Sequence, residues 1–363
     1  MPEQRDASWP GLLEALLQGK DLNAADSRWA MDRIMSGEAS DAQIAAFLVA
    51  LRAKGVTSEE LLGIADTMLG HARRIEVPEP SLDIVGTGGD RAHTVNISTM
   101  AAITAAGAGV TVVKHGNRAA SSSSGTADVL EALGVHLTLS PDQVVASAAR
   151  TGITFCFAQA FHPSMRYVAV PRRDLGISTV FNVLGPLTNP AQPTFSAVGV
   201  ADRRMAPLVA GVFARRGRAA AVFRGDDGLD ELTISTTSTL WWVAGERVGE
   251  HTVDPERFGL ERQPLSALRG GTPAENAQVV RELLAGKPGP VRDAVLLNAG
   301  VALALVAAGH AGCTTPPSPA EIEERLATGM ANAAESIDSG AAAARLEQWA
   351  AFTLDPSEPV RPA

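Results

Sequence analysis

Apolar residues recur every three or four positions in the first 75 or so residues, and this spacing predicts helices. Ser40 is typical of a helix start, and Thr57 with Glu60 three residues later has the pattern of a capping box. The stretches with helical spacing are 12–17, 29–35, 44–51 and 61–69. We therefore expect a small all-helical domain over residues 1–75.

After residue 80, short apolar runs alternate with helical stretches. Strands are expected at 82–85, 110–113, 153–158, 196–200 and 219–224, with a β-rich run at 232–243. Helices are expected between them at 99–106, 126–133, 141–150 and 205–215, and again throughout 272–352. This alternation predicts an α/β fold with a mostly parallel sheet flanked by helices. The larger domain should span 80–353, and the tail at 354–363 should be loose.

Composition indicates a soluble cytoplasmic protein. The 363 residues are 45% hydrophobic, which suffices for a buried core. The longest apolar runs, such as 295–308, are interrupted and too short for a membrane span, and the polar segment 1–7 is unlike a signal peptide. Cys156 and Cys313 offer neither a disulfide framework nor metal-ligand spacing. The formal net charge of −9 argues against nucleic-acid binding, because general binding of that kind needs a basic face.

Two polar, glycine-rich loops, 86–90 and 114–125, each follow a predicted strand and precede a predicted helix. Open α/β sheets bind ligands at such strand ends, where glycines let the backbone approach an anion and free amides donate to it. The first loop alone is as typical of a tight turn as of a phosphate site. The second combines a lysine, a histidine, an arginine and four serines, which favours a ligand-binding loop over a purely structural one. Neither matches a Walker or a Rossmann pattern.

An acidic cluster at 225–231 follows another predicted strand and carries four carboxylates. Carboxylates on a loop suit Mg²⁺ bridged to phosphate, but a solvated acidic turn explains this segment equally well on its own. The presence of two phosphate-type loops in the same chain favours the metal site. Within the cluster, Asp226 and Asp227 are the residues that could serve only to shape the loop.

These motifs resemble the anthranilate phosphoribosyltransferase family, and the resemblance covers about residues 9–349. The segments that carry it are 86–90, 96–99, 114–125 with 127–131, 181–190 and 228–232, in the expected order. The resemblance implies that part of 166–190 joins the helical domain, and that 80–353 binds 5-phosphoribosyl 1-diphosphate (PRPP). It also implies a homodimer through the helical domain.

The substrates implied are PRPP and anthranilate, joined to give N-(5-phosphoribosyl)anthranilate and diphosphate in tryptophan biosynthesis. The resemblance assigns PRPP contacts to Gly86, Gly89, Asp90, Thr94, Asn96, Ile97, Ser98, Thr99, Lys114, His115, Gly116, Asn117, Arg118, Ala119, Ala120, Ser121, Ser122 and Thr126. It assigns anthranilate contacts to Gly86, Asn117 and Arg172, with Arg173 as the neighbouring choice, and Mg²⁺ binding to Ser98, Asp230 and Glu231.

The chemistry explains why no general base is assigned. Displacement of diphosphate builds negative charge on the leaving group, which Mg²⁺ and loop amides can stabilise. The nucleophile is an aromatic amine whose lone pair is already free at neutral pH, so positioning should carry most of the rate. His115 is therefore expected to orient backbone or substrate, and His162 to pack at a helix start. One departure from the family is Ser178, where many members carry arginine.

Two other functions remain open from the sequence. A pyrimidine nucleoside phosphorylase also handles ribose and phosphate, but it would carry a glycine-rich variant of the lysine loop. A non-catalytic nucleic-acid-binding relative is disfavoured by the acidity of the chain and by the intact pair of Asp230 and Glu231.

Overall fold

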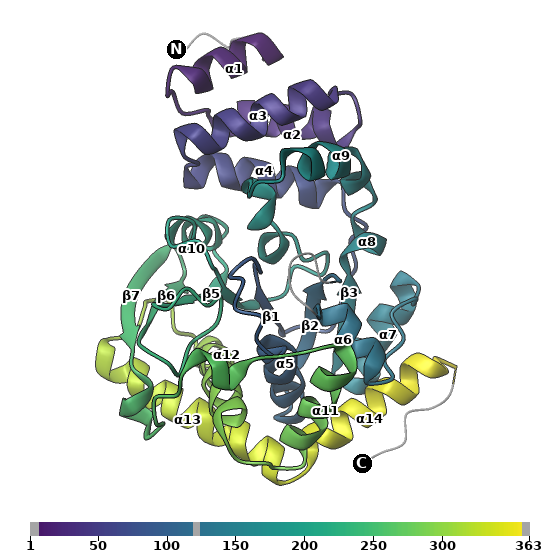
Figure 1. The fold of residues 1–363 in the computed structure, drawn as a ribbon, viewed down its shortest axis with the longest axis vertical. Coiled ribbons are helices and arrows are strands. Elements are labelled where there is room, and N and C mark those ends of the chain that lie inside the picture. Colours follow the sequence, from purple (N-terminus) through teal and green to yellow (C-terminus); the bar gives the residue numbers. More distant parts are fainter. Residues whose placement is uncertain (1–6, 119–123, 358–363) are drawn as a thin grey trace.

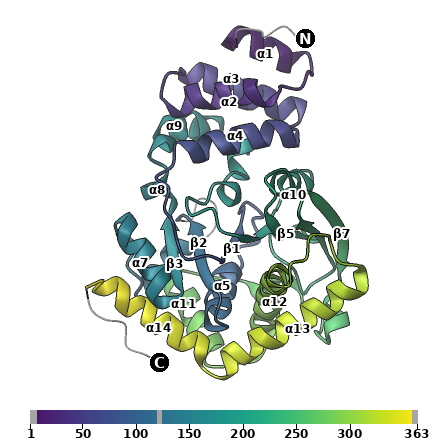
Figure 2. The same ribbon diagram turned by 180° about the vertical axis from the view of Figure 1, so that it is seen from behind.

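The protein is described by a computed structural model that covers residues 7–118 and 124–357. It has the expected small helical domain and larger α/β domain (Figure 1). Viewed from either side, the helical domain stands beyond one end of the sheet, while the C-terminal helices wrap the opposite end (Figure 2). The fold class predicted from the sequence is confirmed.

The helical domain begins with four helices and receives a fifth from later in the chain. Its first helices are α1 (Trp9–Leu17), α2 (Ala24–Met35), α3 (Asp41–Lys54) and α4 (Ser58–Gly70). Ser40 and Thr57 form capping boxes at α3 and α4, as their spacing predicts. Helix α9 (Arg166–Leu175) returns to pack against α3 and α2. The chain therefore leaves the sheet and crosses back, as the family resemblance implies.

One seven-stranded sheet forms the centre of the α/β domain, in the order β3-β2-β1-β4-β5-β6-β7. The first five strands in this order are parallel, and β6 and β7 are antiparallel. The strands are β1 (Ser81–Gly86), β2 (Thr111–Gly116), β3 (Ile153–Phe157), β4 (Phe195–Gly199), β5 (Ala219–Gly225), β6 (Ser238–Ala244) and β7 (Arg247–Val253). The carboxyl ends of the parallel strands therefore share one edge, where ligands bind in such sheets.

Helices cover both faces of this sheet. Helices α5 (Ile97–Gly107) and α12 (Pro290–His310) pack on one face, and α7 (Pro141–Thr151) and α10 (Ala206–Arg215) pack on the other. Leu82 and Ile84 of β1 contribute to the first core, whereas Val85 joins a second core shared with α10 and the helical domain. The remaining helices are α6 (Thr126–Ala132), α8 (Ala158–Phe161), α11 (Pro273–Leu284), α13 (Pro319–Asp338) and α14 (Ala341–Leu354). Short 3₁₀ turns lie at Pro163–Met165, Val180–Asn182, Gly185–Leu187, Pro255–Phe258 and Leu265–Leu268.

Two sequence-based boundaries were wrong. The β-rich run expected at 232–243 is a strand only from Ser238, because the residues before it bend through turns, and β7 was not predicted. The second polar loop was expected to begin at residue 114, but Lys114 and His115 belong to β2, which ends at Gly116. Polar side chains at a buried strand end can be satisfied by other strands and loops, which local sequence does not reveal.

Helix α12 extends beyond both ends of the apolar run at 295–308. Among the described residues it is the one helix long and apolar enough to cross a membrane by length and composition. However, 72% of its most apolar window is buried within the fold. Because its neighbours are α13, α5 and three strands of the sheet, its apolar composition is that of a core helix.

Candidate functional site

The loop after β1 is shaped so that an acidic residue from another strand end can lie against it. Gly86 ends β1, and a Cβ there would lie 2.3 Å from Oδ2 of Asp230. Gly199 ends β4, and its Cβ would lie 1.6 Å from the carbonyl oxygen of Asp230. Gly88 and Gly89 have φ values of 69° and 87°, a region that glycine adopts readily. Glycine on two neighbouring strands thus makes room for Asp230.

The structure brings together the three residues expected to bind metal. The backbone N–H of Gly88 donates to Oδ2 of Asp230 at 2.6 Å, and that of Ser98 donates to Oε1 of Glu231 at 3.1 Å. Burial, and then the charge of Asp90, raises the pKa of Asp230 to about 7. Burial, and then the charge of Asp230, raises the pKa of Glu231 well above its ordinary value. The two buried carboxylates therefore lack sufficient positive charge around them.

Lys114 is a cation whose charge interacts with these carboxylates, and its side chain is almost completely buried. Its ammonium donates to the carbonyl of Ile84 and, at 3.2 Å, to Oγ of Ser98. Burial lowers the pKa of Lys114, while the charges of Asp83, Glu231 and Asp230 oppose this shift. Lys114 therefore lies beneath the site, in contact with a proposed metal ligand, and does not project from an open loop.

Asp83 and Asn189 form a buried polar pair beside β2 that was not identified from the sequence. Oδ1 of Asp83 accepts from the backbone N–H of His115 at 3.2 Å, and Oδ2 accepts from the Asn189 side chain at 2.9 Å. The Asn189 amide also donates to the carbonyl of Val113 at 2.8 Å. Burial raises the pKa of Asp83 to about 6, although the charge of Lys114 opposes this. The available signal was a single carboxylate within the apolar run of β1.

His115 and His162 lie together under the site, with ring centroids 5.2 Å apart. Nδ1 of His115 lies 2.9 Å from the carbonyl of Gly185, so this nitrogen carries the hydrogen. Burial, followed by the neighbouring histidine, lowers the pKa of His115 to about 3, and burial lowers that of His162 to about 4. Both rings are therefore neutral near pH 7.

Acid should destabilise the protein through these histidines. Because the pKa of folded His162 lies below the unfolded value near 6.5, the unfolded chain binds more protons as pH falls from 6.5. The contribution of His162 to stability should therefore fall by about 2 kcal/mol between pH 7.5 and 5, and His162→Asn should remove that part of the pH dependence, whatever the buried carboxyls contribute. Urea unfolding at the two pH values measures the difference. Equal losses in wild type and variant would contradict the assignment.

Asn96 joins the two polar loops to a C-terminal helix. Its side chain donates to the carbonyl of Ser124 at 3.1 Å and accepts from the Asn276 amide at 2.8 Å. Asn276 also accepts from the backbone N–H of Gly271 at 2.8 Å. Thr94 forms an isolated antiparallel bridge with Arg269 in the same region. Asn276 was not predicted, because it lies 180 residues after its partner.

Arg118 does not face the carboxylates of the site. Its guanidinium forms ion pairs with Asp128 at 3.1 Å and with Glu131 at 2.6 Å, both on α6. Asn117 is exposed, and its side-chain oxygen accepts from the backbone N–H of Arg118 at 2.8 Å. The predicted contacts at Ala119, Ala120, Ser121 and Ser122 lie outside the described residues.

The other predicted PRPP contacts differ in what they can offer. Ile97 and Thr99 are both 1% exposed, so only their backbone could meet a ligand. Oδ1 of Asp90 accepts from the N–H of Ala92 at 3.1 Å, and Thr126 begins α6. Asp226 and Asp227 bond to their own loop, as expected of residues that shape it; their hydroxyl partners are Thr233, Ser235, Thr237 and Thr239.

The two candidate arginines on α9 have different surroundings. Arg173 is exposed and forms an ion pair with Asp174 at 3.1 Å. Arg172 is half-buried, lies over the ring of Phe181 at 5.3 Å, and has its pKa lowered by burial. No carboxylate among the described residues lies within ion-pair distance of Arg172. These surroundings favour Arg172 as the arginine that is available to an anion.

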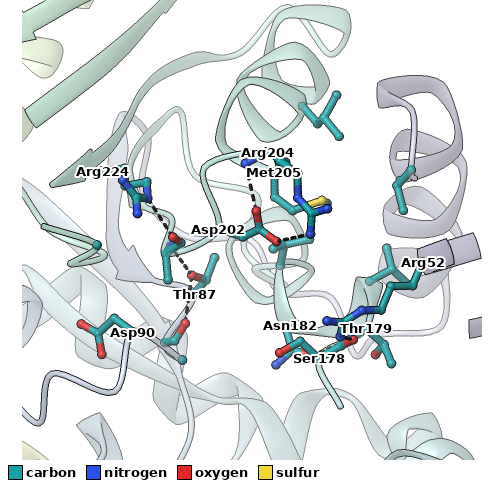
Figure 3. Close-up of a pocket in the computed structure, with 18 of the residues that line it drawn as sticks. Arg52, Thr87, Asp90, Ser178, Thr179, Asn182, Asp202, Arg204, Met205 and Arg224 are labelled. Carbon is teal, nitrogen blue, oxygen red and sulfur yellow. Dashed lines mark hydrogen bonds and ion pairs between the residues drawn. The ribbon is translucent and has the colours of Figure 1, made fainter. Parts of the chain in front are cut away.

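A cavity of about 590 Å³ adjoins the outer side of the glycine loop and is lined by both domains. Figure 3 shows Arg224 beside Thr87 on one side, and Arg52 near Ser178 on the other. Arg52 donates to the carbonyl of Ser178, the position where this chain departs from the family pattern. Because Asp90 and the loop glycines also line the cavity, it opens directly beside the carboxylate site and has the size of a small-molecule cleft.

Comparison with known proteins agrees with this geometry. Residues 10–72 match the helical bundle domain of a glycosyl transferase family, and residues 78–343 match the a/b domain of that family. The anthranilate phosphoribosyltransferase of a Nocardioides species is 59% identical over 347 residues, covering 96% of this chain and 99% of that protein.

Solved structures show the same relationship. Anthranilate phosphoribosyltransferase from Thermus thermophilus has a TM-score of 0.85 and 41% identity, over 94% of this chain and 99% of that chain. The Saccharomyces cerevisiae enzyme in complex with PRPP and Mg has a TM-score of 0.83 and 30% identity, over 95% and 98%. The two domain matches and these similarities show that the chain belongs to the anthranilate phosphoribosyltransferase family of glycosyl transferases.

Proposed function

We propose that this protein transfers the phosphoribosyl group of PRPP to the amine of anthranilate, with release of diphosphate, as a step of tryptophan biosynthesis. The observation that carries the proposal is the meeting of Ser98, Lys114, Asp230 and Glu231 beside a glycine-rich loop. Family membership and the names of the relatives agree with it. A nucleoside phosphorylase or a nucleic-acid-binding relative has no comparable support.

The residues fit a Mg²⁺ ion. Asp230 and Glu231 supply hard oxygen ligands, and their raised pKa values reflect a need for positive charge. Ser98, whose backbone N–H donates to Glu231, adds a hydroxyl oxygen. No group of three or more His, Cys, Asp or Glu side chains in residues 7–118 and 124–357 could hold a metal. Phosphate oxygens would therefore complete the coordination. When bound, Mg²⁺ would neutralise charge on the departing diphosphate.

The chain's own groups account for binding and orientation. The glycines after β1 allow the backbone to approach the diphosphate closely, and the start of α5 supplies a favourable dipole. Lys114 adds positive charge from below the site. His115 is neutral, buried and held on the carbonyl of Gly185, so it orients the end of β2 and needs to take no proton for the reaction to proceed. Rate enhancement would come from positioning and charge stabilisation.

Arg172→Ala should raise the Michaelis constant for anthranilate and leave that for PRPP nearly unchanged. The half-buried guanidinium is free to pair with the carboxylate of anthranilate, and such a charge-assisted pair is worth about 1.5–3 kcal/mol, or roughly 10- to 100-fold in binding. Initial rates with each substrate varied in turn measure the effect. Arg173→Ala is the matched control, because that side chain is exposed and already paired with Asp174. A loss confined to PRPP would reassign Arg172.

The direct test of the function is the loss of anthranilate fluorescence when purified protein is mixed with PRPP and Mg²⁺, and then with a chelator. Decay that depends on Mg²⁺ supports the proposal. Absence of decay with folded protein would overturn it. Release of a free base from a nucleoside with phosphate would then indicate a phosphorylase, and a salt-sensitive gel shift with single-stranded DNA would indicate nucleic-acid binding.

We also propose a homodimer formed through the helical domain. Large apolar side chains are exposed on its helices or directly after them: Leu17, Val49, Val170 and Ile177, which are 75%, 41%, 41% and 47% exposed. Burying such side chains against a second copy would be favourable. A cytoplasmic location is proposed from the composition of the chain. Sedimentation at several protein concentrations tests the dimer, and a monomer at all of them would contradict it.

A further inference from the structure

Asn298 is the polar exception in the most apolar helix of the protein. Helix α12 has thirteen buried residues, and all except Asn298 are alanine, glycine, valine or leucine. The Asn298 side chain is fully buried in the middle of this helix. A buried amide with no partner would cost stability, so its contacts indicate why it is there.

The amide of Asn298 bonds to both backbone polar groups of a single residue, Leu232. Oδ1 accepts from the Leu232 N–H at 2.9 Å, and Nδ2 donates to the Leu232 carbonyl at 2.8 Å. Nδ2 also donates to the carbonyl of Ala294 on the same helix at 2.9 Å. Leu232 lies between β5 and β6, outside any strand. The Asn298 amide therefore satisfies both of its backbone polar groups, as a neighbouring strand does within a sheet.

Leu232 directly follows the two carboxylates of the site. Leu232 is itself fully buried, so water cannot replace the bonds from Asn298. On the other side of the pair, Gly88 and Ser98 donate their N–H groups to Asp230 and Glu231. The acidic pair is therefore held from one side by backbone amides of the glycine-rich loop and of the start of α5, and from the other side by a core helix.

We propose that Asn298 is a positioning residue that fixes Leu232 and thereby holds Asp230 and Glu231 where they can bind a divalent cation together with diphosphate. This proposal rests on the proposed function only for the identity of the substrate. Groups that orient metal ligands from behind commonly change metal affinity by about 10- to 100-fold when they are removed.

The test is the affinity of the full-length protein for Mn²⁺ with inorganic diphosphate present, followed by the electron paramagnetic resonance signal of free Mn²⁺. Asn298→Ala should weaken Mn²⁺ binding by about 10- to 100-fold. Asn298→Asp keeps an acceptor for the Leu232 N–H and should weaken binding less. If the alanine variant does not fold, the aspartate variant alone carries the test.

Ser336→Ala is the matched control, because Oγ of Ser336 donates a buried hydrogen bond to the carbonyl of Thr104 at 2.7 Å, between α13 and α5. It should lower thermal stability without changing Mn²⁺ affinity. Wild-type affinity in both Asn298 variants, or equal weakening in Ser336→Ala, would overturn the proposal. Kinetics add a second readout: the Michaelis constant for PRPP should rise while that for anthranilate does not. If wild type shows no turnover but binds Mn²⁺, the proposed function fails and the role of Asn298 is still tested.

Discussion

Replacing Asp230 by Asn, or Glu231 by Gln, is expected to lower kcat/KM for PRPP by about 10²- to 10³-fold and to raise the Mg²⁺ concentration needed for half-maximal rate. Each substitution removes one of the two negative charges available to the cation. Thermal stability should be equal or higher, because burial and Asp90 already disfavour the charged form of Asp230. Fluorescence assays over a Mg²⁺ series, with melting curves at pH 8, measure both effects.

Asp226→Asn is the control for these variants. Asp226 lies in the same loop but is exposed and bonded to Thr237 and Thr239, so its amide should leave turnover near the wild-type value. Unchanged kinetics in both Asp230→Asn and Glu231→Gln would remove the metal assignment. A fall in melting temperature comparable to the fall in rate would indicate that the pair is structural.

Local patterns predicted most helices and strands because buried apolar residues recur along the chain at the spacing of each kind of element. In β1, Leu82 and Ile84 face one core and Val85 faces the other, so both faces are apolar and the strand is read as a continuous run. The sheet order could not be obtained in this way. Strand β1 pairs with β4, with Leu82 beside Phe195, and a contact at such separation leaves no local signal.

The family resemblance pointed to the residues of the candidate site, and it did not point to the residues that lie behind them. Ser98, Asp230 and Glu231 belong to motifs with several chemical residues close together in sequence. Asp83 and Asn298 are instead single polar residues in apolar segments, which local sequence cannot distinguish from tolerated exceptions. Their roles depend on partners far along the chain, and only the fold shows that each satisfies backbone groups beside the site.

Lys114→Met is expected to lower the free energy of unfolding by about 3–5 kcal/mol, because it leaves buried carboxylates without their cation. The loss should be greater at pH 8 than at pH 5. Burial raises the pKa of Asp83 to about 6 even with Lys114 present, and removal of the lysine raises it further. When the folded pKa of a carboxyl exceeds its unfolded value, the protein loses stability as pH rises from the unfolded pKa to the folded one. The higher folded pKa of Asp83 in the variant therefore extends this loss to higher pH than in wild type.

Lys54→Met separates this effect from the general cost of breaking a buried ion pair. Lys54 has a side chain only 3% exposed and pairs with the fully buried Glu60 at 2.9 Å, in the helical domain. Its loss should destabilise the protein, while the folded fraction keeps its affinity for PRPP. Lys114→Met should lose that affinity as well, because its ammonium reaches Ser98 beside the acidic pair. Urea unfolding at the two pH values, with PRPP binding measured below the unfolding transition, distinguishes them. Equal PRPP affinity in the two variants would show that Lys114 serves the fold alone.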